Sequence, residues 1–409
     1  MVGKKVGETM IVGIIGGGAS GMAAALAASE NPDVTVLLFE RQARLGRKLQ
    51  ATGNGRCNLT NIHAAQVGYH GQDRSFVLPA LTRFGPEETL AWFRSLGLYT
   101  VTEPSGRVYP YSDQANSVLD VLRFALEKPN IRVSTGKEVS RIRREGDGFL
   151  VDDVHCDRLI IACGGLAGSK LGGTMSGYQL LRSMGHRMTR LRPALVQLKC
   201  KWKGIVALKG VRANCHAAIL RDGSLHSEST GEIQFTEYGL SGPVIFEVSR
   251  DACQGAGDWL CRLDLLPELS FEEVFEALSN RRKTMLPTEE LLTGILHNRL
   301  GKVLVKEAEI LYKRRAFELC DRDLKEVCSL VKSFEIPLSE PLGMDSAQVT
   351  AGGIVTEDFD PHTMESKLVP GLYACGEVLD VDGDCGGYNL QWAWSSGRCA
   401  GCHAGKESI

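Results

Sequence analysis

The sequence predicts an α/β protein in which a nucleotide-binding domain is split by two inserted modules. Three observations predict this. The chain opens with an apolar strand, a glycine-rich turn and an Ala-rich helix; its middle shows an antiparallel β pattern and then a helical pattern; and glycine-rich, β-like sequence returns before its end. We expect the split domain at residues 1–192 and 341–409, an inserted antiparallel β module at 193–267 and a helical module at 268–340.

The first elements form a βαβ unit. Residues 10–15 are a short β-branched apolar run, as in a strand buried on both faces. The glycine-rich turn follows, and residues 22–29 then read as a helix. After a turn, residues 34–39 form a second buried strand that ends at Glu40. The unit predicts a parallel sheet, for which 131–135 and 158–163 supply further strands, with helices at 85–97 and 117–126.

The inserted modules are predicted from a change of period. Apolar residues alternate with polar ones at 211–219, and Arg221–Ser224 is a hairpin turn signal. From 270 to about 332 the apolar spacing becomes three to four residues, which predicts helices. Prolines at 267, 287 and 337 punctuate this region.

The composition is that of a globular protein. Of 409 residues, 43% are hydrophobic and 23% are charged, and 47 basic residues against 49 acidic ones give a formal charge of −2. So balanced a charge provides no basic surface for nucleic acid or an anionic membrane. We therefore expect a small-molecule substrate and neither a nucleic-acid nor a membrane partner; the oligomeric state stays open.

Cysteine usage indicates the compartment. Thirteen cysteines are scattered from Cys57 to Cys402, which suits reduced thiols better than a disulfide framework. The apolar stretch at 10–28 superficially resembles a signal peptide or a membrane span, but five glycines interrupt it. No other apolar run reaches the roughly 18 residues that a span needs. We expect a cytoplasmic protein.

The glycine-rich turn carries the strongest motif. Gly16, Gly18 and Gly21 form G-x-G-x-x-G, and Glu40 follows nineteen residues after the last glycine. Such glycines permit a tight turn, close approach of a pyrophosphate and close helix packing, and the acid accepts hydrogen bonds from a ribose. We expect a side chain at Gly18 both to block the pyrophosphate and to strain the turn. An unrelated Gly-rich turn is the alternative, but strand, helix, strand and acid in register favour dinucleotide binding.

Two further segments point to a large polar ligand. Residues 45–61 are too rich in glycine, asparagine and basic residues for a helix or a core strand. We expect a loop that wraps a ligand with its amides and with Arg47, Lys48 and Arg56, the alternative being a solvated surface loop. Near the end of the chain, 386–391 opens a helix whose N-terminus would stabilise negative charge on the same ligand.

These segments carry a resemblance. Residues 16–21, 46–61, 231–243 and 347–397 are similar to the HI0933-like family of FAD-dependent oxidoreductases. The resemblance implies a two-dinucleotide-binding-domain flavoprotein fold, with a split Rossmann-like FAD domain, a β-barrel-like insert and a helical insert. It also implies non-covalently bound FAD. The cofactor-binding residues expected from the motif and the resemblance are Gly16, Gly18, Ala19, Ser20, Gly21, Glu40, Arg41, Lys48, Thr52, Gly53, Asn54, Val139, Gly376, Glu377, Gly387, Tyr388, Asn389 and Leu390.

The expected reaction also follows from the resemblance. Flavin N5 would carry the hydride, and the favoured reaction is NAD(P)H-dependent reduction of a C=C bond in an enone, with 3-oxo bile-acid or steroid-like substrates as the favoured class. NAD(P)H would dock transiently, because the second candidate motif at 163–168 begins with Cys163 and is incomplete. The alternatives are a flavin oxidase of a small amine or aminoketone, a non-catalytic flavoprotein and an RNA-modifying flavoprotein.

No catalytic side chain is identified, because neither a C-x-x-x-x-C pair nor a Ser-His-Asp set is evident near these motifs. Asn389 is a candidate for tuning the flavin: at the start of a helix, its amide and nearby N–H groups could stabilise negative charge at N1 and O2. The resemblance would place Gly386 to Asn389 beside the isoalloxazine. The alternative is that Asn389 merely caps the helix.

Cysteine and histidine side chains were weighed as other sites. Cys399-x-x-Cys402-His403 matches a haem-attachment signature, with metal or thiol chemistry as a second alternative and incidental helix residues as the favoured interpretation. Cys57 could have a pKa lowered by Arg56 and by helix ends, although a small buried residue is the favoured role. We expect no metal site, because the remaining histidines lack ligand spacing; they are His63, His70, His155, His186, His216, His226, His297 and His362.

Overall fold

The computed structural model describes residues 9–65, 67–250 and 252–406. It divides into two compact units, one formed by Met1–Arg192 with Val349–Ile409 and the other by Pro193–Gln348. The chain passes from one to the other through β12 (Arg192–Ala194) and returns just before β19 (Val349–Ala351). No helix among the described residues is both long and apolar enough to cross a bilayer.

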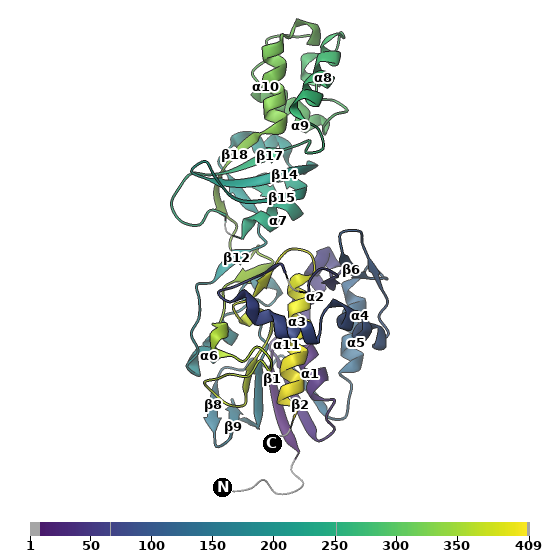
Figure 1. The fold of residues 1–409 in the computed structure, drawn as a ribbon. Helices are drawn as coiled ribbons and strands as arrows, with labels where there is room; N and C mark the ends of the chain where they lie inside the picture. The colour runs from purple at the N-terminus through teal and green to yellow at the C-terminus, as the bar shows by residue number, and fades with distance from the viewer. Residues whose placement is uncertain (1–8, 66, 251, 407–409) are drawn as a thin grey trace. The chain divides into compact units, whose positions relative to one another are not determined.

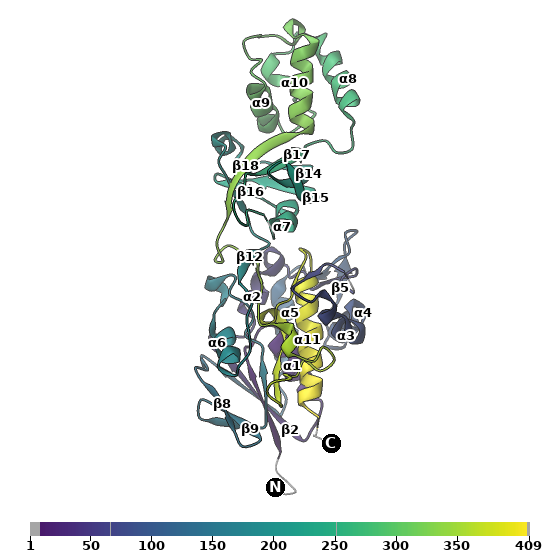
Figure 2. The same cartoon turned by 60° about the vertical axis from the view of Figure 1, so that its left-hand side comes forward.

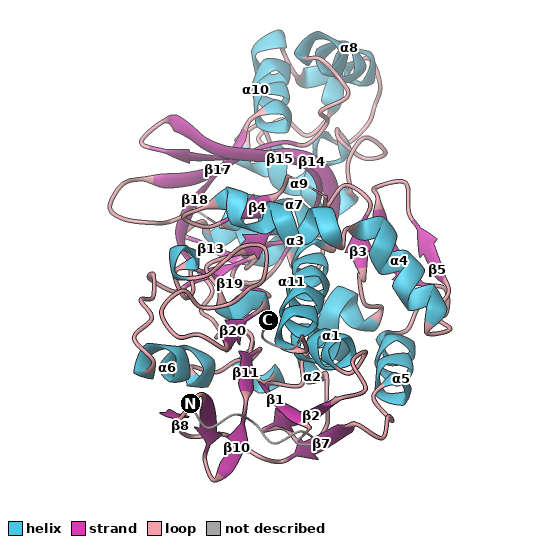
Figure 3. Cartoon of the chain, turned by 60° about the horizontal axis from the view of Figure 1, so that its bottom comes forward, coloured by secondary structure: helices cyan, strands magenta, loops and turns pink. Residues whose placement is uncertain are grey.

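The first unit is built on a five-stranded parallel sheet. Its order is β20-β11-β1-β2-β7, and the labels of these strands follow one another in that order in Figure 3, between α6 and α5. The central strand has Val12 and Ile14 fully buried, which explains its unbroken apolar run. The strands are β1 (Met10–Ile15), β2 (Val34–Glu40), β7 (Ile131–Thr135), β11 (Arg158–Ile161) and β20 (Leu372–Ala374).

Two helices from opposite ends of the chain pack together on this sheet. α1 (Ala19–Ala28) and α11 (Tyr388–Ala404) lie side by side in Figure 1, in purple and yellow. Their backbones are so close that a methyl group at three glycines, spaced four residues apart in the second half and at the C-cap of α11, would meet a carbonyl oxygen of α1. These positions are Gly397, Gly401 and Gly405.

Shorter elements complete the first unit. Its other helices are α2 (Arg47–Ala51), α3 (Leu78–Arg83), α4 (Pro86–Ser95), α5 (Ala115–Ala125) and α6 (Ser176–Ser183). It also has three small antiparallel sheets. The first has the order β3 (Thr60–Asn61), β6 (Arg107–Pro110), β5 (Thr100–Thr102), and the second β10 (Val154–Cys156), β9 (Gly148–Val151), β8 (Ile142–Glu145). The third pairs β21 (Asp382–Gly383) with β4 (Tyr69–His70).

The second unit combines a closed six-stranded barrel with helices. The barrel order is β13 (Leu198–Cys200), β16 (Gly239–Ser241), β15 (Ser224–Phe235), β14 (Arg212–Arg221), β17 (Trp259–Asp264) and β18 (Phe334–Pro341). α7 (Pro243–Ser249) packs on β15, and Figure 2 shows α8 (Phe271–Arg282), α9 (Asn298–Glu307) and α10 (Asp321–Lys332) gathered at one end of the barrel.

The predicted fold class is confirmed, with two local corrections. Residues 334–341 were assigned mostly to the helical module, yet they form β18, because Phe334, Ile336 and Leu338 alternate with exposed residues and face the barrel core. The first unit accordingly resumes at Val349 rather than at residue 341. Segment 45–61, predicted to contain no helix, includes the five-residue α2.

Candidate cofactor site

The glycines of the first turn differ in why they are needed. Gly16 has φ of 110° and its Cβ would clash with the carbonyl oxygen of Ala162, while a Cβ on Gly21 would clash with that of Gly16. Both positions therefore require glycine for the protein's own packing.

Gly18 has no such internal reason. Its φ of −80° and ψ of −167° are open to any residue, and a Cβ there would meet no heavy atom within 4 Å. The expectation that a side chain would strain this turn is therefore wrong. Gly18 is the N-cap of α1, whose first turn holds no acidic residue and receives no side-chain cap. The open space faces N–H groups that a helix leaves unsatisfied, as an anion site requires.

Glu40 lies against this turn at the end of β2. Its Oε2 accepts a hydrogen bond from the Gly17 N–H at 2.8 Å and its Oε1 accepts one from the Gln42 N–H at 2.6 Å. These two bonds orient the carboxylate, whose remaining lone pairs are those that a ribose would use. The chain carrying Val139 is held nearby, because the Lys137 N–H donates to the Glu40 carbonyl at 2.9 Å. Arg41 instead donates to the Gly172 carbonyl.

The loop at 45–61 contacts the turn, but most of its basic side chains bind other groups of the protein. The Gly46 N–H donates to the Gly17 carbonyl at 3.0 Å, and Lys48 pairs with Glu377 at 2.8 Å, which joins two expected site residues. Arg56 pairs with Glu103 and Asp113 and stacks on a tyrosine ring. Three basic side chains were expected to wrap a ligand. Two of them bind protein groups instead: Arg56 binds the two carboxylates, and Arg47 donates a hydrogen bond to Gln42.

Left-handed backbone shapes the tip of this loop. Thr52–Gly55 forms a short 3-10 turn in which Gly53 and Asn54 both have φ of 57°. Glycine and asparagine are the residues that tolerate this conformation best. The Thr-Gly-Asn-Gly sequence is thus explained by geometry, and the turn exposes its backbone amides.

Two glycines bring the C-terminal segments to the same place. Gly376 has φ of 76°, and a Cβ there would lie 2.5 Å from the Ser20 hydroxyl oxygen. Gly387, the N-cap of α11, has φ of 108°, and its Cβ would clash with the Thr60 carbonyl. The segment around residue 376 therefore packs against the start of α1, and the segment around residue 387 packs against the segment around residue 60.

Asn389 does something that the sequence did not suggest. Its Oδ1 accepts from the Gly383 N–H at 2.8 Å and its Nδ2 donates to the Gly383 carbonyl at 2.7 Å. Gly387 is the N-cap of α11, so Asn389 does not cap it. The side-chain amide instead fixes the loop before α11, and the first backbone N–H groups of that helix receive no side-chain cap.

One polar group at the site is left over. The Oδ1 atom of Asn58 is buried and has no hydrogen-bond partner among the described residues. Native proteins rarely leave such groups unpaired. An open cradle at Gly18 and an unpaired amide at Asn58 are what a site shaped for a polar ligand would show in the protein alone, so the residues present fit a dinucleotide.

Burial disfavours the thiolate form of the cysteines that the sequence singled out. Cys57 is fully buried, and burial raises its pKa to about 12, so the expectation of a lowered pKa is wrong. Burial likewise raises the pKa of Cys399 to about 12, and its thiol donates to the His362 carbonyl. His403 accepts from Arg83 at 2.7 Å. Within the described part of the chain, no three His, Cys, Asp or Glu side chains gather as metal ligands.

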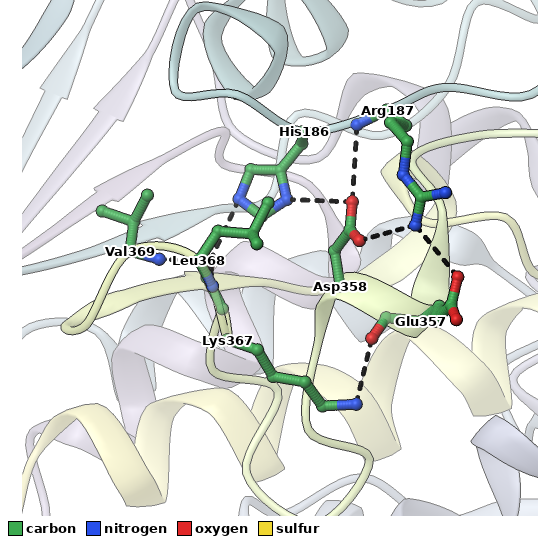
Figure 4. A network of polar contacts seen from close by, with 8 residues as sticks. His186, Arg187, Glu357, Asp358, Lys367, Leu368 and Val369 are labelled. Atoms are coloured by element: carbon green, nitrogen blue, oxygen red, sulfur yellow. Dashed lines mark hydrogen bonds and ion pairs between the residues drawn. The ribbon is translucent and has the colours of Figure 1, made fainter.

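A Ser-His-Asp set exists that sequence reasoning missed (Figure 4). Ser366 Oγ lies 3.1 Å from His186 Nε2, and His186 Nδ1 lies 3.7 Å from Asp358 Oδ2. Arg187 pairs with Asp358 at 2.9 Å. Burial lowers the pKa of His186, although Asp358 opposes that shift, so the imidazole is neutral near pH 7.

The three side chains are connected in the same sequence as a hydrolase triad, serine to histidine to aspartate, but the serine cannot act as a nucleophile. The Leu368 and Val369 N–H groups donate to Ser366 Oγ at 3.1 and 2.9 Å, so both of its lone pairs are occupied. The hydroxyl proton must then point at His186, and the oxygen has no electron pair free for attack. The network ties the segment after α6 to the chain that leads into β20, as Figure 4 shows.

A second histidine–carboxylate pair lies close to α11. His70 Nε2 and Asp384 Oδ1 are 2.6 Å apart and both side chains are partly exposed. His70 is on β4, which pairs with β21, and Asp384 is in the loop that Asn389 fixes. His70, assigned from sequence to surface or core, is thus hydrogen-bonded to a carboxylate just before the start of α11.

The comparisons with known proteins agree with this fold. The model of the HI0933-like protein Rossmann domain matches residues 10–403. The chain is 41% identical over 400 residues to 3-dehydro-bile acid delta(4,6)-reductase of Clostridium scindens, covering 95% of this chain and 98% of that one. It is 31% identical over 393 residues to ribosomal RNA dihydrouridine synthase of Escherichia coli, covering 94% and 95%.

Among solved structures, 3-ketosteroid delta1-dehydrogenase of Sterolibacterium denitrificans superposes with a TM-score of 0.50 at 12% identity, covering 96% of this chain and 99% of that one, which is a likeness of fold alone. The family match spans both halves of the split domain and the insert between them. The resemblance inferred from the motifs is thereby confirmed, and the chain belongs to the HI0933-like Rossmann-domain family.

Proposed function

We propose that this protein is an FAD-dependent oxidoreductase that uses NAD(P)H to reduce a carbon–carbon double bond conjugated to a carbonyl group. The observation that carries the proposal is Gly18, a glycine that the protein's own structure does not need, placed where a helix N-terminus meets open space. The relative with 41% identity is named as a reductase of a 3-dehydro bile acid, and such a substrate is an enone.

The cofactor would be held by four parts of the chain. The turn at Gly18 and the first turn of α1 would bind the pyrophosphate, and Glu40 the adenosine ribose. The loop at 52–58 and the N-terminus of α11 would contact the other half of the molecule. When bound, FAD would supply the hydride for reduction of the substrate.

Saturating a C=C bond adds a proton as well as a hydride, and we propose that a side chain of this protein donates that proton. His70 is the donor that we propose. Asp384, 2.6 Å away, orients the ring; His70 lies on β4, which pairs with β21, and Asp384 follows β21 in the loop that leads into α11.

RNA is the second candidate substrate. The two relatives named ribosomal RNA dihydrouridine synthases match 94% of this chain at 31% and 30% identity. By its name, dihydrouridine is uridine with two hydrogens added, so the bond chemistry would be shared. Relatives of this kind weaken the argument that a net charge of −2 excludes RNA.

The test begins with the purified protein. We expect it to be yellow and to release FAD on acid precipitation; colourless protein that cannot be reconstituted would refute the proposal. Anaerobic mixing with NADH or NADPH should bleach the flavin absorbance, and re-oxidation by a 3-oxo-4-ene steroid or bile acid should restore it. Re-oxidation by unmodified ribosomal RNA alone would select the second candidate, and reduction by aminoacetone instead of NAD(P)H would select the oxidase.

A further inference from the structure

Arg107 is a partly buried arginine to which the described part of the protein gives no counter-ion. Its guanidinium forms no ion pair and donates no hydrogen bond among the described residues. Glu103, whose N–H donates to the Arg107 carbonyl at 2.8 Å, gives its carboxylate to Arg56 instead. A cation that loses part of its hydration without gaining a partner is costly. We therefore look for its partner in a ligand.

The fold holds Arg107 against the start of α11. β6 is the middle strand of its sheet, and Val108 on it is fully buried, so Arg107 and Tyr109 face the opposite way. A Cβ on Gly386 would lie 2.8 Å from the Arg107 Nε atom. Asn61, which pairs with Arg107 across the sheet, donates to the Gly386 carbonyl at 3.0 Å. The guanidinium therefore lies along the residue that precedes the N-cap of α11.

The Tyr109 hydroxyl is another polar group of this face without a partner. Tyr109 is 6% exposed, and its hydroxyl forms no hydrogen bond with the described residues. The ring is fixed, because the Arg56 guanidinium lies 3.9 Å from its centroid and a Cβ on Gly53 would lie 3.4 Å from its Cε1. Burial raises the pKa of Tyr109, although Arg107 opposes that shift, so the hydroxyl keeps a proton to donate.

These two side chains are open to a ligand and stand beside a helix N-terminus. The unpaired atoms of Arg107 and Tyr109 are not among the polar atoms that the described structure closes off from solvent. The first turn of α11 has no side-chain cap and no acidic residue. The carboxylate just before it, Asp384, is held by His70 at 2.6 Å. A cation, a phenol and unsatisfied N–H groups thus lie together without an acceptor assigned to them.

We propose that Arg107 and Tyr109 bind the carbonyl oxygen of the substrate and stabilise the negative charge that it gains during reduction of the double bond. The inference deepens the proposed function and rests on it. Neither residue belongs to the glycine-rich motif or to the segments that carry the family resemblance.

The chemistry of an enone explains why such donors are needed. Hydride addition to the β-carbon breaks the π bond, and its electron pair moves through the α-carbon onto the carbonyl oxygen as an enolate. Protonation of the α-carbon turns that pair into the new C–H bond and restores the carbonyl group. The hydride originates in NAD(P)H and arrives by way of FAD, and the proton comes from the side chain proposed above. Donors at the oxygen act most strongly in the enolate, so they accelerate the step rather than merely bind the substrate.

The two half-reactions of the holoprotein test this role. In Arg107→Gln, re-oxidation of the reduced flavin by a 3-oxo-4-ene bile acid should slow about a hundredfold, the usual loss when one such donor is removed. Reduction of the flavin by NAD(P)H should be unchanged, because no substrate carbonyl takes part in it. Tyr109→Phe should slow re-oxidation about tenfold, the worth of one neutral hydrogen bond. Arg107→Lys, which keeps the charge, should recover part of the rate lost in Arg107→Gln.

4-Nitrophenol provides a readout without turnover. Its anion is a planar oxyanion like the enolate, and its neutral and ionised forms absorb at different wavelengths. Bound to oxidised wild-type holoprotein, the probe should ionise at a lower pH than in water, and Arg107→Gln should abolish this shift. The melting temperature of Arg107→Gln should equal that of wild type, because the cation has no partner in the protein.

Arg94→Gln is the matched control. The Arg94 guanidinium lies 5.5 Å from the centroid of the Tyr99 ring, so its loss should alter neither half-reaction nor the probe. Equal re-oxidation rates in wild type, Arg107→Gln and Tyr109→Phe would overturn the inference. So would an Arg107→Gln protein in which reduction by NAD(P)H slows as much as re-oxidation, since the cation would then act on the flavin, or loss of folding in both Arg107 variants. A wild-type protein that no enone re-oxidises would instead refute the proposed function.

Discussion

Replacing Gly18 with alanine tests whether the turn at Gly18 binds the pyrophosphate of the cofactor. The added methyl group meets no heavy atom within 4 Å and the backbone has φ of −80°. Alanine at such a position gains about 0.4–1 kcal/mol from a less flexible unfolded chain. It is also a poorer N-cap than glycine by a similar amount. The two effects offset each other, so we expect the apo-protein to unfold with almost the same free energy as wild type.

Cofactor binding should respond very differently. A methyl group at Gly18 would displace the pyrophosphate from the N–H groups of the first turn of α1, and each charge-assisted hydrogen bond lost costs about 1.5–3 kcal/mol. That corresponds to a dissociation constant raised about tenfold to a hundredfold for one bond. The assay is a titration of apo-protein with FAD, followed by flavin fluorescence, beside chemical denaturation of the same samples.

Two other glycines serve as controls. Gly343 lies in the second unit, and a Cβ there also meets nothing within 4 Å, so Gly343→Ala should leave FAD affinity unchanged and raise the free energy of unfolding by about 0.4–1 kcal/mol. Gly21→Ala should fail to fold, since its Cβ would clash with the Gly16 carbonyl. A Gly18→Ala protein that binds FAD as tightly as wild type would show that this turn is not the phosphate site.

Three further outcomes are expected. Asn389→Ala removes three hydrogen bonds to the preceding loop, so the unfolding free energy should fall by about 2–4 kcal/mol while the flavin potential stays unchanged; a shifted potential would restore the tuning role. Cys57, with its pKa raised to about 12, should resist iodoacetamide in the folded protein while the exposed Cys320 reacts, and mass spectrometry would reveal labelling of Cys57 that contradicts this. The pKa of His186 is lowered on folding, so its contribution to stability is present above the unfolded value of about 6.5 and is lost as the pH falls below it; denaturation at about pH 7.5 and 5.5 should show this loss, and His186→Gln should reduce it.

The parts of the fold that could be predicted are those with local signals. The βαβ unit was predictable because strand period, glycine spacing and the terminal Glu40 all lie within one short stretch. The hairpin at Arg221–Ser224 was predictable from its turn residues. The last barrel strand was missed although Phe334, Ile336 and Leu338 alternate, because Pro337 within it and helices before it suggested a break.

The details of the site depended on contacts between distant residues. Nothing near Ser366 in the sequence indicates that His186 lies beside it, since the two meet only through folding of the loops around the sheet. Likewise, the motif explained why Gly18 is a glycine, but not that Asn389 would turn its amide toward Gly383. Side-chain partners of this kind are chosen by tertiary packing, which a single sequence does not display.

The packing of α1 against α11 has a consequence for how the protein is made. During synthesis α1 leaves the ribosome long before α11, so Ser20 and Ala24 meet their partners Gly397 and Gly401 only after α11 has been made. Until then α1 has an uncovered face, although Met22 to Ala25 are fully buried in the finished molecule. Contacts of such long sequence separation form slowly. A nascent chain would therefore acquire its cofactor only after α11 has been made, and a truncation that removes α11 should leave the first unit unable to fold even though its sheet has been synthesised.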